Sequence, residues 1–221
     1  MFVLTLDQIG SRRSDDLLPA LLTELRVRGP LAGRAPALPH GGHPPRTPAG
    51  LVLPLERTVG DEAQVVLDDP VLTLDLALHL LRIGGWSIGI GAGPVRLPLA
   101  ESARASAGEA FIAAREAVEA AKSRSRTVPL AVRGVDAEAA ADAEAVLSLI
   151  GAVIRRRSVA GWAVVDRVVQ GERQQDVADA LSITQQAVSA RLAAGLWDEE
   201  RAARPAAARL LGRVGGARQD G

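Results

Sequence analysis

Along the first 135 residues, segments with the apolar pattern of a strand alternate with segments that have the apolar period of a helix. Short apolar runs rich in strand formers, such as "FVLTL" at 2–6, alternate with segments such as "SDDLLPALLTELR" at 14–26, whose leucines fall on one helical face. The pattern predicts strands at 2–6, at both ends of 51–67, at 86–95 and at 127–134, and helices at 14–26, 71–82 and 108–122. This order, β-α-β-β-α-β-α-β, predicts an α+β sandwich with a mainly antiparallel sheet, close to the ferredoxin-like pattern.

Cap signals mark the ends of the predicted helices. Ser14 is placed as the N-cap of the first helix. Asp69 followed by Pro70 is a favourable N-cap and N1 pair for the second helix.

Glycine and proline mark special places in the predicted strands. The two apolar runs in 51–67 meet at Gly60–Asp61, which indicates a hairpin, and Pro54 favours an edge strand or a bulge. Gly89 and Gly91 leave one face of the strand at 86–95 bare. Another backbone or a ligand can therefore approach that face closely.

The pattern is only helical from Asp136 onward. Helices are predicted at 136–157, 158–170, 173–181, 184–196 and 198–214. The change predicts an α+β domain at 1–135, a small helical domain at 136–214 and a disordered tail at 215–221. Residues 30–50 are rich in proline and glycine, which predicts a loop.

The segment "QQDVADALSITQQAVSARL" fits the helix-turn-helix template. Its framework residues are Ala178 where two helices cross, Ser182 in the turn, Ile183 in the core, Thr184 as the cap of the second helix, and Val188 and Leu192 facing inward. Serine stands where this turn often has glycine, which predicts some strain in the turn.

The second helix of this motif offers polar side chains that can read bases. If it enters a major groove, Gln185, Gln186 and Ser189 would contact base edges, with Thr184 at the cap and Arg191 beside them. Glutamine can form two hydrogen bonds to adenine. The sequence therefore predicts DNA as a partner.

The net charge of the helical half argues against DNA as a partner. Residues 136–221 contain 11 arginines and 12 acidic residues, a net charge of −1, whereas DNA-binding proteins draw much of their affinity from phosphate contacts. A positive patch requires the scattered arginines to converge, and the candidates are Arg155, Arg156, Arg157, Arg173, Arg201 and Arg204. A compact helical domain for dimerisation or protein contact is the alternative.

Composition restricts the classes of protein further. Apolar residues at 48% and charged residues at 24% fit a soluble globular protein. The absence of cysteine excludes a disulfide framework and agrees with a reducing compartment. Because neither a secretory signal nor an apolar run of about 20 residues is found, we expect a cytoplasmic protein with no membrane partner.

Carboxylates follow two predicted strands that we expect to be neighbours. Asp7 ends the first strand, and Asp61 and Glu62 lie at the hairpin. Two acids on neighbouring strands provide the oxygen ligands that Mg²⁺ prefers. The simpler interpretation is that Asp61 is a turn residue after glycine and Glu62 a solvated strand residue. His40 and His43 offer two imidazoles, but no cysteine or third nearby histidine completes a zinc site.

The ordered motifs "LDQIGSRR", "VGDEAQ", "SIGIGAGPV" and "GEAFIAAREAVEAAK", within residues 2–134, resemble the SatD-like family of bacterial proteins. The hairpin and the strand after it are also similar to those of class III nucleotide cyclases. This resemblance implies a nucleotide cyclase-like domain in which Asp7 and Asp61 occupy the metal-binding positions and Arg115 the position of the transition-state arginine. Phe111 stands where cyclases have an asparagine, which implies a degenerate domain with a sensing or dimerisation role. Arg115 also lies four residues before Glu119, the spacing of a surface helix pair.

The helix-turn-helix segment resembles the DNA-binding helices of sigma-factor region 4 and of MarR-type bacterial regulators, which implies transcriptional control. The first hypothesis is therefore a homodimeric transcriptional regulator that binds DNA and responds to a small-molecule or nucleotide effector. The second is a Mg²⁺-dependent nucleotide-binding or nucleotide-converting enzyme that uses Asp7 and Asp61. The third is a non-catalytic protein-interaction scaffold.

Overall fold

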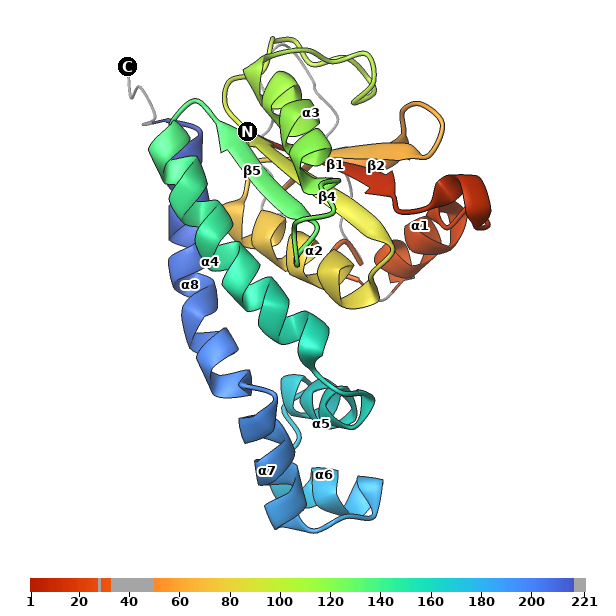
Figure 1. The fold of residues 1–221 in the computed structure, drawn as a ribbon, viewed down its shortest axis with the longest axis vertical. Coiled ribbons are helices and arrows are strands. Elements are labelled where there is room, and N and C mark those ends of the chain that lie inside the picture. Colours follow the sequence, from red (N-terminus) through yellow and green to blue (C-terminus); the bar gives the residue numbers. More distant parts are fainter. Residues whose placement is uncertain (28, 33–49, 217–221) are drawn as a thin grey trace.

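The protein is described by a computed structural model over residues 1–27, 29–32 and 50–216. Within these residues it is an α+β protein with a five-stranded mixed sheet and eight α-helices (Figure 1). The strands are β1 (Phe2–Gln8), β2 (Leu51–Arg57), β3 (Glu62–Leu67), β4 (Trp86–Ala92) and β5 (Leu130–Gly134). The helices are α1 (Leu18–Val27), α2 (Pro70–Ile83), α3 (Glu109–Ala121), α4 (Ala137–Arg156), α5 (Val159–Val169), α6 (Gln174–Leu181), α7 (Gln185–Ala194) and α8 (Trp197–Val214).

The predicted order of strands and helices is confirmed. The sheet order is β2-β3-β1-β4-β5, and every neighbouring pair is antiparallel except β4 and β5, which are parallel. The hairpin at Gly60–Asp61 joins β2 to β3 as predicted. Pro54 lies in the edge strand β2, where the register with β3 shifts on both sides of Leu53. Edge position and irregularity together explain why a residue without an N–H is tolerated there.

Of the two caps predicted for the first two helices, one is confirmed and the other is wrong. Asp69 accepts a hydrogen bond from the N–H of Val71 at the start of α2 (2.8 Å), with Pro70 as its first residue. Ser14 does not cap α1, which begins at Leu18 after Asp16 accepts from its N–H (3.1 Å). The reason is Pro19, which lacks an N–H and fits only the first turn of a helix, so the helix cannot begin near residue 15.

Helices cover the two faces of the sheet differently (Figure 1). Leucines of α1 and α2 share the main hydrophobic core with Leu4 and Ile88 of the sheet. The opposite face carries α3, whose backbone lies directly against β4. A Cβ atom on Gly89 would lie 2.2 Å from the nitrogen of Val118, and one on Gly91 would lie 2.2 Å from the oxygen of Ala110. The bare face predicted for this strand therefore admits a helix backbone, and no ligand is needed to explain it.

The helical half forms two regions with different packing partners. Residues of α4 and of the C-terminal half of α8, including Leu147 and Leu211, belong to the main core together with the sheet. A separate cluster joins α5, α6 and α7 with Trp197. Figure 1 shows α4 and α8 as a long pair that carries this three-helix unit at its far end. The hydrophobic clusters do not divide at residue 135, and the boundary predicted there stays a prediction.

Some expectations from the sequence fall outside the described residues. His40, His43 and most of the predicted loop at 30–50 belong to this group, as does most of the predicted tail at 215–221. No helix in the part of the chain that the structure describes is both long and apolar enough to cross a membrane.

Candidate nucleic-acid interface and acidic strand edge

Helices α6 and α7 meet through the tight turn expected of the helix-turn-helix template. Ser182 follows α6 in the left-handed region, with φ 52° and ψ 45°. The hydroxyl oxygen of Thr184 then accepts a hydrogen bond from the N–H of Ala187 (3.1 Å) and caps α7. Both features were predicted, and the left-handed serine confirms that the turn takes a conformation that glycine adopts more readily.

The inward side of the three-helix unit is apolar, as predicted. Val188 and Leu192 of α7 are buried, and Ala178 of α6 is buried where the two helices cross. Val164 of α5 and Trp197 complete the cluster. This packing fixes which side of α7 faces solvent.

The opposite side of α7 is polar and accessible. Gln185, Gln186 and Ser189 are exposed, while Arg191 is partly buried. The first turn of α7 carries no acidic residue, so the partial positive charge of the helix N-terminus is not neutralised there. This end of α7 can therefore accept either a base edge or a phosphate.

Four of the six arginines proposed as a positive patch are engaged by carboxylates, namely Arg157, Arg173, Arg201 and Arg204. Arg155 and Arg156 are exposed. Residues 158–197 contain three arginines and four acidic residues. Arg173 pairs with Asp176 (2.9 Å) and Arg167 with Glu172 (2.9 Å). The surface around α7 is therefore polar with little net charge, and a converging patch of free arginines is not formed by these residues.

Arg157 lies inside the protein, at the junction of α4 with the three-helix unit. Its Nη2 donates to Glu200 Oε2 (2.6 Å) and to the carbonyl of Gly195 (2.7 Å), and both charged side chains are fully buried. The guanidinium also lies over the rings of Trp162 and Trp197, 4.4 and 5.7 Å from their centroids. These contacts hold α4, α5 and α8 together.

The same ion pair extends to the α+β region. Arg204 of α8 donates to Glu200 Oε1 (2.6 Å) and to Asp75 of α2 (3.0 Å). Arg157 and Arg204 were predicted as candidates for a surface patch, and Glu200 was not predicted to have a role. The available signal was aromatic content, since two of only three tryptophans flank Arg157.

The hairpin places Glu62 beside Asp7, and both carboxylates are held by protein donors. Asp7 stands opposite Glu62 in the β1–β3 register, and Asp61 precedes Glu62 in the turn. Lys122, at the end of α3, lies 2.7 Å from Asp7 Oδ2 and 2.7 Å from Glu119 Oε1. Burial lowers the pKa of Lys122, but its hydrogen bonds to these two carboxylates outweigh burial and hold the pKa above its usual value.

This arrangement does not fit a Mg²⁺ site. Glu62 Oε1 accepts from the hydroxyl of Thr58 (2.7 Å) and from the amide of Gln64 (3.3 Å), and Lys122 already neutralises Asp7. Among the described residues no three His, Asp or Glu side chains gather as a metal would require. Metal binding by Asp7 and Asp61 stays a prediction, and no reaction step is assigned to it.

Arg115 lies on the exposed side of α3. Its expected surface partner, Glu119, pairs with Lys122. Phe111 packs against the smaller hydrophobic cluster on this face of the sheet. The side chain of Phe111 therefore contributes to packing. Arg115 occupies the same stripe of α3, since Phe111, Arg115 and Lys122 are spaced by four and seven residues.

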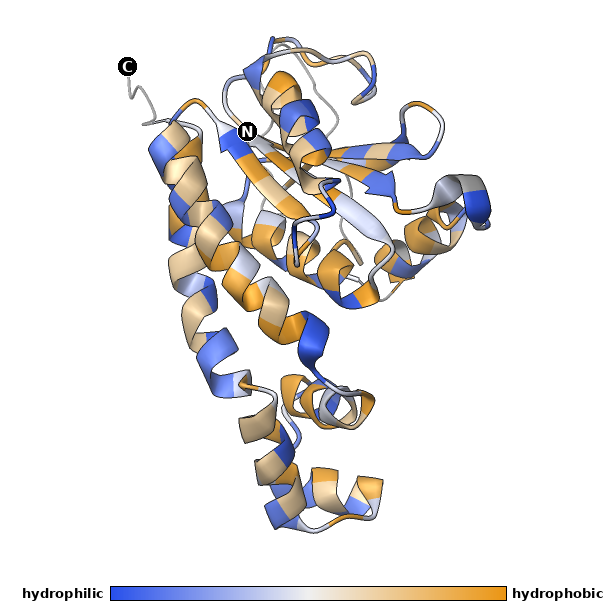
Figure 2. Ribbon diagram, in the orientation of Figure 1, coloured by the Kyte–Doolittle hydropathy of each residue, from blue (hydrophilic) through white to orange (hydrophobic). Residues whose placement is uncertain are grey.

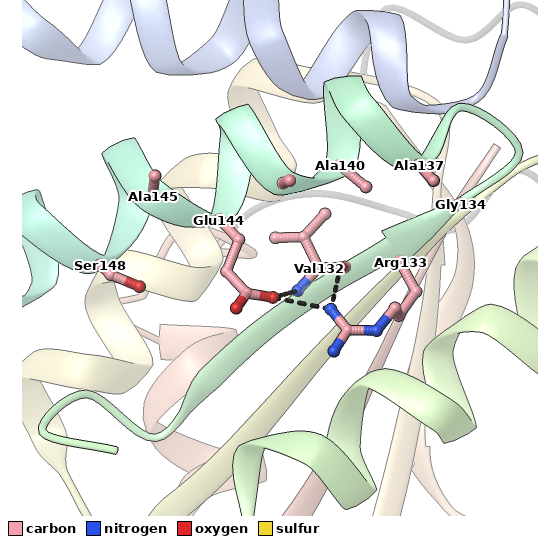
Figure 3. A pocket seen from close by; sticks show the side chains of 9 residues that line it. Val132, Arg133, Gly134, Ala137, Ala140, Glu144, Ala145 and Ser148 are labelled. Carbon is pink, nitrogen blue, oxygen red and sulfur yellow. Dashed lines mark hydrogen bonds and ion pairs between the residues drawn. The ribbon is translucent and has the colours of Figure 1, made fainter. Parts of the chain in front are cut away.

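A hollow of about 360 Å³ lies between β5 and α4 (Figure 3). Glu144 of α4 spans it, because its Oε2 accepts from the N–H of Val132 (2.9 Å) and from Arg133 (2.8 Å). Its Oε1 lies 2.7 Å from Nη1 of Arg126, which also donates to the carbonyl of Leu130 (3.0 Å). Side chains thus satisfy the outward backbone groups of this edge strand, which prevents another strand from pairing with it.

The charge of Glu144 is stabilised in this position. Burial raises the pKa of its carboxyl, but the hydrogen bonds from the N–H of Val132 and from Arg126 and Arg133 hold it below the usual range. This contact joins α4 to β5 and was not predicted from the sequence.

Comparison with known proteins assigns neither a family nor a function to this chain. No protein-family model matches the chain, and neither a curated protein nor a solved structure matches it.

Proposed function

We propose that this protein is a DNA-binding transcriptional regulator whose α6 and α7 form a helix-turn-helix. The observation that carries the proposal is the geometry of these helices. Thr184 caps α7, Val188 and Leu192 are buried, and the polar side chains at the start of α7 are exposed. The likeness of this segment to sigma-factor region 4 and MarR-type regulators supports the same class.

In this proposal α7 enters the major groove by its N-terminal end. The groove accommodates an α-helix, and Gln185 and Gln186 would present their amides to base edges. Thr184 and Ser189 would flank these contacts, with Arg191 near the sugar-phosphate backbone. The unopposed N-terminus of α7 adds a favourable interaction with phosphate.

The low charge of the three-helix unit shapes the expected binding. The number of phosphates that a protein neutralises sets how steeply its affinity falls with salt. The logarithm of the binding constant falls against the logarithm of the salt concentration with a slope of about 0.9 per phosphate contacted. Because the arginines of this unit are largely paired with carboxylates, we expect a shallow salt dependence and weak non-specific binding. A homodimer that contacts two half-sites would compensate for the modest affinity of one copy.

The α+β region is proposed as a sensing or dimerisation domain with a ferredoxin-like, nucleotide cyclase-like fold. The sheet order β2-β3-β1-β4 and the SatD-like motifs support this assignment. A small-molecule or nucleotide effector is expected to act near Asp7 and Arg115. The junction of Arg157, Glu200, Arg204 and Asp75 provides the physical connection from this region to α7.

The test is retention of DNA by the purified full chain. Sheared genomic DNA is incubated with the protein at low salt, the retained fragments are sequenced, and their affinity is measured. Gln186→Ala or Gln185→Ala should weaken binding to the retained sites about tenfold, because one base contact contributes about 1–3 kcal/mol. Gln170→Ala, an exposed glutamine at the end of α5, is the matched control and should leave affinity unchanged.

Two outcomes would redirect the assignment. Failure to retain any fragment at low salt, with capture of a protein partner by α5–α7, would favour the scaffold hypothesis. Conversion of ATP or GTP in the presence of Mg²⁺ or Mn²⁺, abolished by Asp61→Asn, would favour the enzyme hypothesis. The pairing of Asp7 with Lys122 makes the second outcome the less expected one.

A further inference from the structure

The outer side of α4 has no charged residue over its middle turns. Between Asp142 and Arg155 the one charged residue is Glu144, whose carboxylate is held against β5 (Figure 3). The outward positions carry Ala145, which is exposed, and Leu149, which is 71% exposed. A helix face that stays in water normally carries charged side chains.

The neighbouring helix shows the ordinary pattern. The exposed side of α8 includes the charged residues Asp198, Glu199, Arg201, Arg209 and Arg213. Figure 2 shows the middle of α4 in mostly apolar colours, before a strongly hydrophilic C-terminal end. The lack of charged residues on the outer face of α4 is therefore not a general property of the surface helices of this protein.

The two ends of this face carry opposite charges. Glu138 and Asp142 lie near the N-terminal end, and Arg155 and Arg156 lie at the C-terminal end, all four exposed. Within the described part of the chain none of the four forms an ion pair. Asp142 and Arg156 each lie seven residues from Leu149, so the three share one stripe of the helix.

We propose that a second copy of this chain covers this face, with the two α4 helices packed antiparallel around a two-fold axis near Leu149. In that arrangement Asp142 of each copy lies opposite Arg156 of the other, because both are equally distant from the axis. A parallel pair would instead bring acids to acids and arginines to arginines. Ala145, which is exposed on this face, allows the helix axes to approach closely between these charges.

This self-complementarity is what a two-fold interface requires, since each contact is made twice. One helix pair buries less surface than a standard interface of about 1,600 Å². The dimer should therefore be reversible and depend on protein concentration. The inference rests on α4 alone and holds whether or not the protein binds DNA.

Sedimentation of the full chain over a range of concentrations tests the proposal. Leu149→Glu should raise the dimer dissociation constant at least tenfold, and because Leu149 is exposed the fold should be retained, as circular dichroism would verify. Ile112→Glu introduces the same charge at an exposed position of α3 (63%) and should have no effect. Asp142→Arg should weaken the dimer, and adding Arg156→Asp should restore it.

Crosslinking tests the antiparallel direction. Because the chain has no cysteine, Leu149→Cys should give a single disulfide-linked dimer under oxidising conditions, whereas Glu138→Cys should not. Efficient crosslinking of Glu138→Cys would overturn the antiparallel arrangement. A monomer at all concentrations, or a dimer whose dissociation constant is unchanged by Leu149→Glu, would overturn the interface itself.

Discussion

Replacing Glu200 with alanine tests the buried ion pair at the base of the three-helix unit. Glu200 lies between two guanidinium groups, with Arg157 Nη2 at 2.6 Å and Arg204 Nη2 at 2.6 Å. Both Glu200 and Arg157 are fully buried. Without Glu200, the carbonyl of Gly195 is the remaining hydrogen-bond acceptor for Arg157 among the described residues, and Nη1 of Arg157 already has none.

The expected loss is large because a buried charge would be left without its counter-ion. Removal of one partner of a buried ion pair typically costs about 3–5 kcal/mol. The free energy of unfolding of a domain is about 5–15 kcal/mol in total, so Glu200→Ala should remove a substantial part of it. Glu200→Gln keeps one hydrogen-bond acceptor and should cost less.

Urea denaturation followed by tryptophan fluorescence is the assay. Two of the three tryptophans, Trp162 and Trp197, lie over Arg157 and report directly on the junction. Asp198→Ala is the matched control, since its ion pair with Arg201 on the same helix is exposed and long (3.6 Å) and contributes little. If Glu200→Ala costs less than about 1 kcal/mol, the account of this junction as a buried, charge-dependent contact is wrong.

Three further substitutions test separate parts of the structure. Ser182→Gly should raise the free energy of unfolding by about 0.5–1 kcal/mol in urea denaturation, because glycine adopts the left-handed turn without a Cβ clash; a loss would contradict strain at this turn. Glu144→Gln should destabilise the protein at neutral pH, and unfolding at a series of pH values should show the difference from the unchanged chain shrinking as the pH falls below the usual carboxyl range. The sign follows because the pKa of Glu144 is held low, so its contribution is present above the usual carboxyl range and disappears as the folded carboxyl is protonated; a difference that persists in acid would refute it. Gly91→Ala should lower the free energy of unfolding by about 2–3 kcal/mol or more in thermal or urea unfolding, since its Cβ would meet helix backbone at 2.2 Å. The control is Gly212→Ala in α8, which should be neutral or slightly stabilising because the nearest atom to its Cβ, Pro70 Cγ, lies at 3.8 Å.

Local patterns were sufficient for most of the secondary structure. The hairpin at Gly60–Asp61, the cap at Asp69 and the interruption at Ser182 depend on residues close together in sequence, so their chemistry is visible in one dimension. The prediction of a cap at Ser14 was wrong because it followed the apolar period, whereas Pro19 fixes the start of α1 at Leu18.

Contacts between distant segments could not be read in this way. The bare face at Gly89 and Gly91 indicated a close approach, but only the fold shows that the approaching group is the backbone of α3. Arg157 and Glu200 are 43 residues apart, so their pairing depends on how α4 packs against α8 and does not follow from the pattern of either helix. The candidate DNA-reading residues were predicted because their exposure follows from helical periodicity, while the engagement of Asp7 by Lys122 depends on how α3 packs over the sheet.

Genome-wide crosslinking of the protein to DNA in cells is the direct test of sequence reading by α7. We expect enrichment at a limited set of sites that share a sequence. The enrichment should be lost in the double variant Gln185→Ala/Gln186→Ala and retained in Gln170→Ala. Uniform background signal for the unchanged protein, or site enrichment that survives the loss of both glutamines, would contradict DNA reading by α7.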